Sequence, residues 1–282
     1  MKHLRCPVCQ QNLRYQPDDR VLRCEQGHSF DRAKQGYFNL LLNQHKKSKQ
    51  PGDTAEMVAA RHEFLETGAY QAIIDTATAL LTEAVTEVHS YCDLACGEGY
   101  YTQHLHAALN GHGDLCSTGI DISTPAIKTA ARRSKQMQWL VGSIAHAPIQ
   151  SESQDVLSCM FCRLIDNEAL RILKPDGLLL LVDTAPAHLW SLRSVLYPDI
   201  KGQDFAELPT PKGLTLIKEV RLTRDIQLTS PAQIANLLKM TPHFWRSTQQ
   251  AKDRVYNLDR LDTQIDVHFR LFRKQAKHES VK

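Results

Sequence analysis

The sequence predicts an α/β protein in which a small N-terminal metal-binding ribbon precedes a doubly wound sheet. Three observations lead to this prediction. Strand-like apolar runs alternate with helical patterns through the middle of the chain, a glycine-containing turn joins the first of these strands to a helix, and four cysteine and histidine residues gather near the N-terminus.

The composition is that of a globular chain with a substantial core. The chain has 282 residues, of which 42% are hydrophobic, which is enough for one large domain and a small one. A formal net charge of only +3 means that a nucleic-acid partner would have to meet a local basic patch. No apolar run reaches the roughly 20 residues that span a bilayer, and the N-terminus MKHLRCPVCQ lacks the apolar stretch of a signal peptide. We therefore expect a cytoplasmic location, where the eight cysteines are metal ligands or small buried residues rather than disulfides.

The stretch CPVCQQNLRYQPDDRVLRCEQGH, residues 6–28, predicts a zinc site. It places a Cys-x-x-Cys pair fourteen residues before a Cys-x-x-x-His pair, and a hairpin with QPDD as its turn and RVLRC as its returning strand would bring the pairs together. All four zinc positions are then filled by protein, so the metal would be structural in a ribbon too short to stabilise itself by burial. The expected ligands are Cys6, Cys9, Cys24 and His28. The alternative is that the thiols are incidental and His28 is a surface residue.

The larger domain begins with a βα unit around Gly97 and Gly99. Residues 72–88 carry apolar residues at helical spacing, a short strand is expected over about 90–95, and a helix is expected to begin near Tyr100. The two glycines lie in the turn between strand and helix, where the backbone must approach a ligand or a helix closely. Taken alone, this G-x-G also fits a tight turn with no ligand.

The next units favour a ligand. CSTGIDIS, residues 116–123, predicts a second strand that ends at Asp121, about 20 residues beyond the glycines, as expected of an acid that binds ribose hydroxyls. Ser123 is expected to cap a helix with Pro125 in its first turn. A third strand, QWLVGS, a fourth, DVLSCMF, and an apolar fifth after a Lys-Pro-Asp-Gly turn complete a sheet that is covered on both faces.

The C-terminal third predicts one more strand and a long loop. IDVHFRLFRK, residues 265–274, alternates apolar and polar residues, and Pro231 is expected to open a helix that runs through Met240. LYPDIKGQDFAELPTPKGL, residues 196–214, is a loop of unusual length that we interpret as a lid over the substrate.

The glycine turn distinguishes between two cofactor classes. Dinucleotide enzymes use G-x-G-x-x-G, but the third position here is Thr102. DLACGEG, residues 93–99, instead resembles motif I of class I S-adenosylmethionine-dependent methyltransferases, with Ala95 in place of the usual first glycine. That resemblance implies a Rossmann-like class I methyltransferase sheet with an antiparallel last strand, for which residues 265–274 are the candidate. Alanine at 95 is a mild departure if its φ angle is negative and a costly one if φ is positive.

A basic segment joins the ribbon to this domain. Its run His45-Lys46-Lys47-Ser48-Lys49 is either a phosphate-contacting patch or a solvated charged loop. With the ribbon before it and Arg132, Arg133 and Lys135 later in the chain, RNA becomes the natural partner.

Over nearly its whole length the sequence resembles the RlmA family. The shared features occur in the same order: the ribbon, GYFNLL, HKKSKQPGD, AEM with Arg61 and Phe64, CGEGYYT, and MTPHFWR. Members of that family methylate guanine N1 in a hairpin of large-subunit (23S) ribosomal RNA. The resemblance implies S-adenosylmethionine as methyl donor, Zn²⁺ as structural metal and a large-subunit ribosomal RNA hairpin as partner, with no DNA and no membrane; a homodimer stays open.

The expected cofactor site combines the resemblance with the sheet pattern. The resemblance assigns to the cofactor Gly97 and Glu98 in motif I, Tyr70 in GAYQ and His188 in PAHL. The full expected set is Tyr70, Asp93, Gly97, Glu98, Gly99, Asp121 and His188. No catalytic residue is assigned, although guanine N1 carries a proton at neutral pH, so a carboxylate or histidine near the base is expected to accept it.

The acceptor side departs from the family pattern. After the fourth strand the family has an aromatic residue followed by Ala-Pro, whereas this chain has Phe161-Cys162-Arg163, where the methyl group meets the target base. Phe161 or Trp190 could stack on that base or belong to the core. Cys159 and Cys162 form a second Cys-x-x-Cys with no second pair nearby, so we interpret them as a buried and a site-facing thiol.

The expected domains are a zinc ribbon over 1–35, a basic RNA-contact linker over 36–71, a methyltransferase domain over 72–275 and a flexible tail over 276–282. In this arrangement the ribbon is a recognition module that presents RNA to the site. Two other functions stay open: a small-molecule methyltransferase with a zinc ribbon, and a non-catalytic zinc-containing RNA-binding or assembly protein, which Ala95 would favour.

Overall fold

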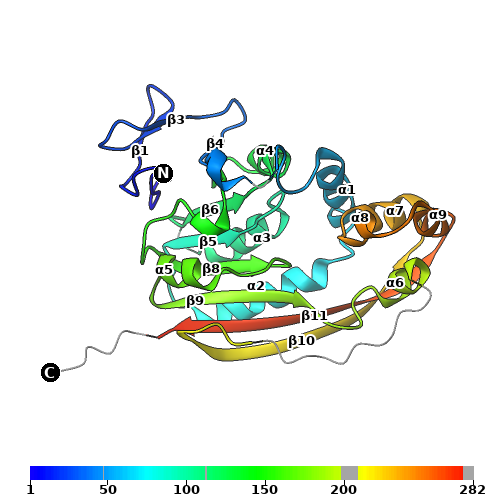
Figure 1. Ribbon diagram of the computed structural model, residues 1–282. Helices are drawn as coiled ribbons and strands as arrows, with labels where there is room; N and C mark the ends of the chain where they lie inside the picture. Colours follow the sequence, from blue (N-terminus) through cyan, green and yellow to red (C-terminus); the bar gives the residue numbers. More distant parts are fainter. Residues whose placement is uncertain (47, 112, 198–208, 276–282) are drawn as a thin grey trace.

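The chain forms two sheets, a small one in the ribbon and a large one in the core (Figure 1). The computed structural model describes residues 1–46, 48–111, 113–197 and 209–275. Most of the loop interpreted as a lid, and the tail over 276–282, lie outside these residues. Among the described residues, no helix is long and apolar enough to cross a membrane.

The ribbon is a three-stranded antiparallel sheet in the order β1-β2-β3. Its strands are β1 (Arg14–Gln16), β2 (Val21–Arg23) and β3 (Ser29–Asp31). The turn between β1 and β2 falls at residues 17–20, so the predicted hairpin is confirmed.

The core is an eight-stranded sheet in the order β10-β11-β9-β8-β5-β6-β7-β4. Five of its strands are those expected from the sequence pattern, and β11 runs antiparallel to both of its neighbours, which confirms the antiparallel last strand. The strands are β4 (Phe38–Asn39), β5 (Ser90–Leu94), β6 (Cys116–Asp121), β7 (Gln138–Val141), β8 (Gln154–Met160), β9 (Leu173–Thr184), β10 (Leu214–Leu228) and β11 (Leu261–Lys274).

Nine α-helices and two short 3-10 helices are described alongside these strands. Thr54 and Ser123 cap α1 and α4 through their side-chain oxygens, as the pattern at Ser123 predicted. The helices are α1 (Ala55–Leu65), α2 (Gln71–Ala84), α3 (Tyr100–Leu109), α4 (Thr124–Arg133), α5 (Asp166–Ile172), α6 (Trp190–Leu196), α7 (Pro231–Lys239), α8 (His243–Arg246), α9 (Gln249–Tyr256), η1 (Asn43–His45) and η2 (Ile144–His146).

The two faces of the sheet are covered in different ways. On one face α2 and α3 pack with alternate residues of the strands, such as Tyr91, Val156 and Leu180. On the other face Cys92, Leu157 and other alternate residues meet α5 and the ribbon. The connection from β7 to β8, residues 142–153, is described throughout and contains η2 but no α-helix.

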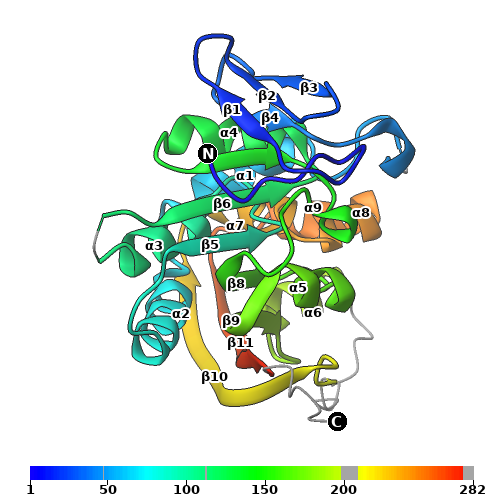
Figure 2. The same cartoon turned by 90° about the vertical axis from the view of Figure 1, so that its left-hand side faces the viewer.

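The ribbon covers the part of this sheet face on which a helix in the β7–β8 connection would pack. Leu4 and Leu22 of the ribbon are fully buried and share one apolar cluster with Phe38 and Leu140 of the large sheet and with Ile149 of the β7–β8 connection. The N-terminal segment is also hydrogen-bonded to the core, because Arg5 N donates to the Pro148 carbonyl at 2.9 Å and Gln150 N donates to the His3 carbonyl at 2.9 Å. Figure 2 shows this dark blue segment crossing in front of the sheet. The ribbon is therefore packed as part of the core.

Leu4→Ala is expected to lower the melting temperature of the whole chain by about 5–15 °C. Leu4 is completely buried, and removing a buried leucine costs about 2–5 kcal/mol, which in a chain of this size corresponds to about 2–4 °C per kcal/mol. The measurement is thermal unfolding followed by circular dichroism. Val8→Ala, at a position in the same segment that is 49% exposed, serves as the control and should melt like the unaltered chain. Equal melting temperatures for both variants would show that the ribbon does not stabilise the core.

Candidate active site and metal centre

The turn after β5 contains three residues with left-handed backbone. Ala95, Gly97 and Gly99 have φ angles of 62°, 57° and 80°. Glycine adopts this conformation freely, whereas an alanine with positive φ costs about 1–2 kcal/mol. Ala95 has a positive φ angle, so the replacement of the usual first glycine of motif I by alanine strains the backbone.

Trp139 of β7 explains why two glycines are required next to this turn. A Cβ atom on Gly99 would lie 2.6 Å from Cη2 of the indole, and one on Gly119 would lie 2.4 Å from Cζ3. Trp139 itself is only 1% exposed, and its Nε1–H donates to the Ser134 carbonyl at 2.9 Å. The indole thus packs against the turn and leaves no room for side chains at Gly99 and Gly119.

Asp121 lies at the end of β6, beside the turn, as predicted. Its Oδ2 accepts a hydrogen bond from Gly97 N at 2.9 Å, and its Oδ1 accepts one from Ser123 N at 2.7 Å. Burial raises the pKa of this carboxyl group, while the two backbone N–H groups favour its charged form. Because a carboxylate has about four acceptor positions, the oxygens can still accept further hydrogen bonds from ligand hydroxyls.

Asp93 is buried, and both of its carboxyl oxygens accept hydrogen bonds. It is 2% exposed, and its oxygens accept hydrogen bonds from Ser158 Oγ at 2.6 Å and Thr102 Oγ1 at 2.5 Å. Burial raises its pKa to about 6. The group joins β5 to β8 and α3, so it fixes the position of the turn; its predicted contact with the cofactor stays a prediction.

Glu98 provides a test of whether the site fits a cofactor. The residue is 2% exposed, and its Oε1 is a buried acceptor without a hydrogen-bond partner in the described part of the chain. Burial raises its pKa, although Arg61 and Arg133 oppose this shift. A buried acceptor is costly unless something donates to it, so a ligand with ammonium or hydroxyl groups fits this position.

Arg61 of α1 was not among the expected site residues, yet it lies directly at the turn. Its Nη1 would be 3.7 Å from a Cβ on Gly97, and its guanidinium forms an ion pair with Asp53. One signal for it was present, since Arg61 belongs to the segments that resemble the family. Arg133 was expected on an RNA-facing patch, but it is 12% exposed and pairs with Glu66 at 2.7 Å beside the same turn.

Four aromatic rings contact one another in a row, which we call the aromatic wall: Tyr70, Tyr101, Phe161 and His188. The Phe161 ring lies 5.9 Å from that of Tyr101 and 6.4 Å from that of His188, the latter at an interplanar angle of 29°. Phe161 is 37% exposed and has a φ angle of 56°, so its side chain reaches solvent from a strained position at the end of β8. Cys159 is buried at the same strand end, as predicted, and Cys162 is half-buried; that its thiol faces the site stays a prediction.

The hydrogen bonds of His188 fix which ring nitrogen carries the proton. Asp266 N donates to its Nδ1 at 3.3 Å, so Nδ1 must be an acceptor. Burial lowers the pKa of His188 to about 4, and the ring is neutral near neutral pH. The remaining proton then lies on Nε2, which is 3.4 Å from the Tyr70 hydroxyl. His188 is thus a hydrogen-bond donor at Nε2, not a proton acceptor.

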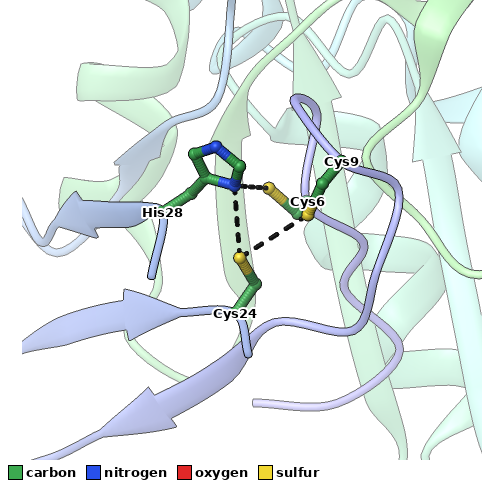
Figure 3. A group of neighbouring side chains, drawn as sticks. All are labelled: Cys6, Cys9, Cys24 and His28. Atoms are coloured by element: carbon green, nitrogen blue, oxygen red, sulfur yellow. Dashed lines mark hydrogen bonds between the residues drawn. The ribbon is translucent and has the colours of Figure 1, made fainter. Parts of the chain in front are cut away.

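The four expected metal ligands converge in the ribbon (Figure 3). Their ligand atoms all lie within 4.8 Å of one another, with Cys24 Sγ 3.4 Å from His28 Nδ1, Cys9 Sγ 3.6 Å from Cys24 Sγ, and Cys6 Sγ 3.7 Å from His28 Nδ1. Zinc bound by thiolate and imidazole would separate neighbouring ligand atoms by about 3.5–3.8 Å, given its bond lengths and tetrahedral angle. The donor set and its spacing therefore fit zinc.

Ala95→Gly is expected to raise the free energy of unfolding by roughly 0.5–1 kcal/mol. The change relieves the left-handed strain, which outweighs the extra entropy that glycine gives the unfolded chain. Ala107→Gly is the matched control, because Ala107 is exposed within α3 and its replacement should lower the free energy of unfolding by about 1 kcal/mol. Urea denaturation measures both. If the two variants are destabilised equally, the backbone at position 95 is not left-handed in solution.

Comparison with known proteins agrees with both parts of the site. The family model "RlmA, N-terminal" matches residues 4–49, and the model "Methyltransferase domain" matches residues 92–177. The "Putative 23S rRNA (guanine-N(1)-)-methyltransferase" of Micromonospora griseorubida is 39% identical over 207 residues, which are 68% of this chain and 69% of that protein. The "23S rRNA (guanine(748)-N(1))-methyltransferase" of Streptomyces fradiae is 31% identical over 252 residues, 87% of this chain and 86% of that enzyme. YxjB of Bacillus subtilis, 28% identical over 93% of this chain and 94% of its own length, bears the same type of name. The chain therefore belongs to the RlmA-type family of 23S rRNA (guanine-N1)-methyltransferases.

Proposed function

We propose that this protein transfers the methyl group of S-adenosylmethionine to N1 of a guanine in 23S ribosomal RNA. The observation that carries the proposal is the match to the Streptomyces fradiae enzyme named for that reaction, which covers 87% of this chain and 86% of that enzyme. The structure adds a suitable site, since the strained turn, a buried acceptor at Glu98 and the aromatic wall lie at the carboxyl ends of adjacent strands.

The cofactors are S-adenosylmethionine and structural zinc. S-adenosylmethionine supplies a methyl group already activated on a sulfonium. Glu98 Oε1 would accept a hydrogen bond from the cofactor, and Asp121 would bind its ribose hydroxyls. The turn over Gly97 and Gly99 would let the backbone approach the cofactor, with Tyr70 and His188 on its opposite side.

His188 constrains the mechanism at the target base. Guanine N1 loses a proton when it is methylated, and His188 cannot take that proton at Nε2, which already carries one. A donor in this position can instead hydrogen-bond an oxygen acceptor on the base or the cofactor. Phe161, exposed and nearly parallel to the His188 ring, would give the base a face on which to stack after it is turned out of the RNA.

The ribbon would take part in RNA binding as well as in covering the sheet. A cavity of about 380 Å³ lies where the N-terminal segment meets the core and is lined partly by Arg5, His45, His146, Glu168 and Arg171, the last two paired at 2.8 Å. The His45 and His146 rings stack there with centroids 4.1 Å apart. An RNA hairpin that lay across the mouth of this cavity would meet Arg5 and the stacked rings, and the basic run begins at His45.

Two further parts of the proposal concern assembly and location. β10 is an outer strand of the sheet, and Leu216 and Ile217 on it are 39% and 41% exposed, so a second copy of the chain could pair there as a homodimer.

A ribosomal RNA substrate also favours a cytoplasmic location, because ribosomes are assembled there in bacteria.

The unaltered protein should transfer labelled methyl from S-adenosylmethionine to an unmodified 23S rRNA transcript. N1 methylation blocks Watson–Crick pairing, so primer extension on the product should stop one position before a guanine. The same stop should be absent in rRNA from cells that lack the protein. Label that reaches only small molecules, or an unchanged pattern of stops, would contradict the proposal.

Cys24→Ser is expected to abolish zinc binding and to lower the melting temperature by more than Leu4→Ala does. Loss of one ligand opens the tetrahedral site, and the ribbon then ceases to cover the sheet. Zinc content is measured by elemental analysis and stability by circular dichroism. Cys116→Ser is the control, because Cys116 is half-buried on β6, outside the cluster, and this variant should keep its zinc. Full stability without zinc would mean that the metal has no structural role.

A further inference from the structure

The most exposed large apolar side chain among the described residues is Trp245 on α8, with 60% of its surface accessible. The other two tryptophans differ from it, since Trp139 is buried under the cofactor turn and Trp190 is half-buried. An indole that is this exposed adds little to the core, and its flat aromatic face is accessible to a ligand.

Contacts with the protein hold the indole of Trp245 in one orientation. Its Nε1–H points to Met57 Sδ of α1 at 3.0 Å, and its ring stands at 80° to that of Phe244, with centroids 5.1 Å apart. Lys252 Nζ lies 4.4 Å above the Phe244 ring and fixes that residue in turn. Because the polar edge of the indole faces the protein, its exposed part is aromatic surface.

The chain segment that contains Trp245 is basic. Residues 239–254 contain Lys239, Arg246, Lys252 and Arg254 against the single acid Asp253, a formal charge of +3. Lys239 is paired with Glu56 at 2.9 Å, whereas Arg246, next to Trp245, is exposed. An aromatic face beside cations suits an unpaired nucleotide, whose base stacks and whose phosphate is negative. It suits an apolar protein surface less well.

α1 places Trp245 close to the proposed reaction site. Met57, its partner, is one helical turn before Arg61, and these two residues lie on the same side of α1. Arg61 contacts the cofactor turn at Gly97 and lies 3.4 Å from the Met240 carbonyl just before α8. The basic run over 45–49 precedes the same helix in the chain. Figure 1 shows α8 beside α1, on the side away from the ribbon.

From this placement we propose that Trp245 is a stacking platform for an unpaired base of the RNA substrate that flanks the methylated guanine. The inference rests on the proposed function. The ribbon would hold the RNA on one side of the cofactor site, and Trp245 with Arg246 would hold it on the other.

The test compares methyl transfer by the full, zinc-loaded chain and by its Trp245→Ala variant on an unmodified 23S rRNA transcript. The KM for RNA should rise about 10-fold, while kcat changes less than about 2-fold and the affinity for S-adenosylmethionine stays the same. Trp245→Phe, which keeps an aromatic face, should recover most of the loss. Trp245 is exposed, so circular dichroism should show the variants to be folded as the unaltered chain is.

Tryptophan fluorescence provides a second readout that does not depend on turnover. Binding of the transcript should quench the emission of the unaltered chain and of Trp190→Phe, and this quenching should disappear in Trp245→Phe. An unchanged KM for RNA in Trp245→Ala, or quenching that persists in Trp245→Phe, would overturn the inference. If Trp245→Ala changes the sedimentation coefficient of the chain but leaves its KM for RNA unchanged, the inference is overturned. Trp245 would then contact another protein chain. Absence of methyl transfer by the unaltered chain would instead refute the proposed function.

Discussion

One apolar sheet face, which α5 covers only in part, is the constraint on which the rest of this structure depends. Parallel strands need cover on both faces, and the connection from β7 to β8 provides only a 3-10 turn where a helix would do this. Leu4, Leu22 and Phe38 of the N-terminal region fill that area. The zinc that folds the ribbon is thereby coupled to the stability of the methyltransferase core, although no zinc ligand lies in the core itself.

The turn over residues 95–99 is strained, and buried groups from neighbouring elements border it. Ala95 has a left-handed conformation, the Trp139 indole packs against Gly99, and the Asp93 carboxyl group before the turn accepts a hydrogen bond from Thr102. Each of these contacts joins the turn to a different strand or helix. A backbone that is unfavourable locally can persist when the surrounding packing determines it in this way.

The sequence was sufficient for features that depend on local spacing. The zinc ligands, the strand-turn-helix around Gly97 and the Ser123 cap all follow from short patterns with a direct physical meaning. β10 was missed because it is an outer strand whose residues are mostly exposed, and charged residues interrupt its apolar pattern. The packing of the ribbon was missed for another reason. Whether an apolar residue such as Leu4 faces its own module or a distant sheet depends on tertiary contacts that no local pattern records.

The same distinction between local and tertiary information separates the two sides of the candidate site. Asp121 and Glu98 stand in a recognisable motif, but the donor character of His188 depends on the backbone N–H of Asp266, which is 78 residues away in the chain. Arg61 likewise reaches the turn only because α1 packs beside it. This helix carries Arg61 toward the cofactor and Met57 toward Trp245, and it follows directly on the basic run. One rigid element thus sets the distance between the groups proposed for the cofactor and those proposed for the RNA, which alignment of a base with a methyl group requires.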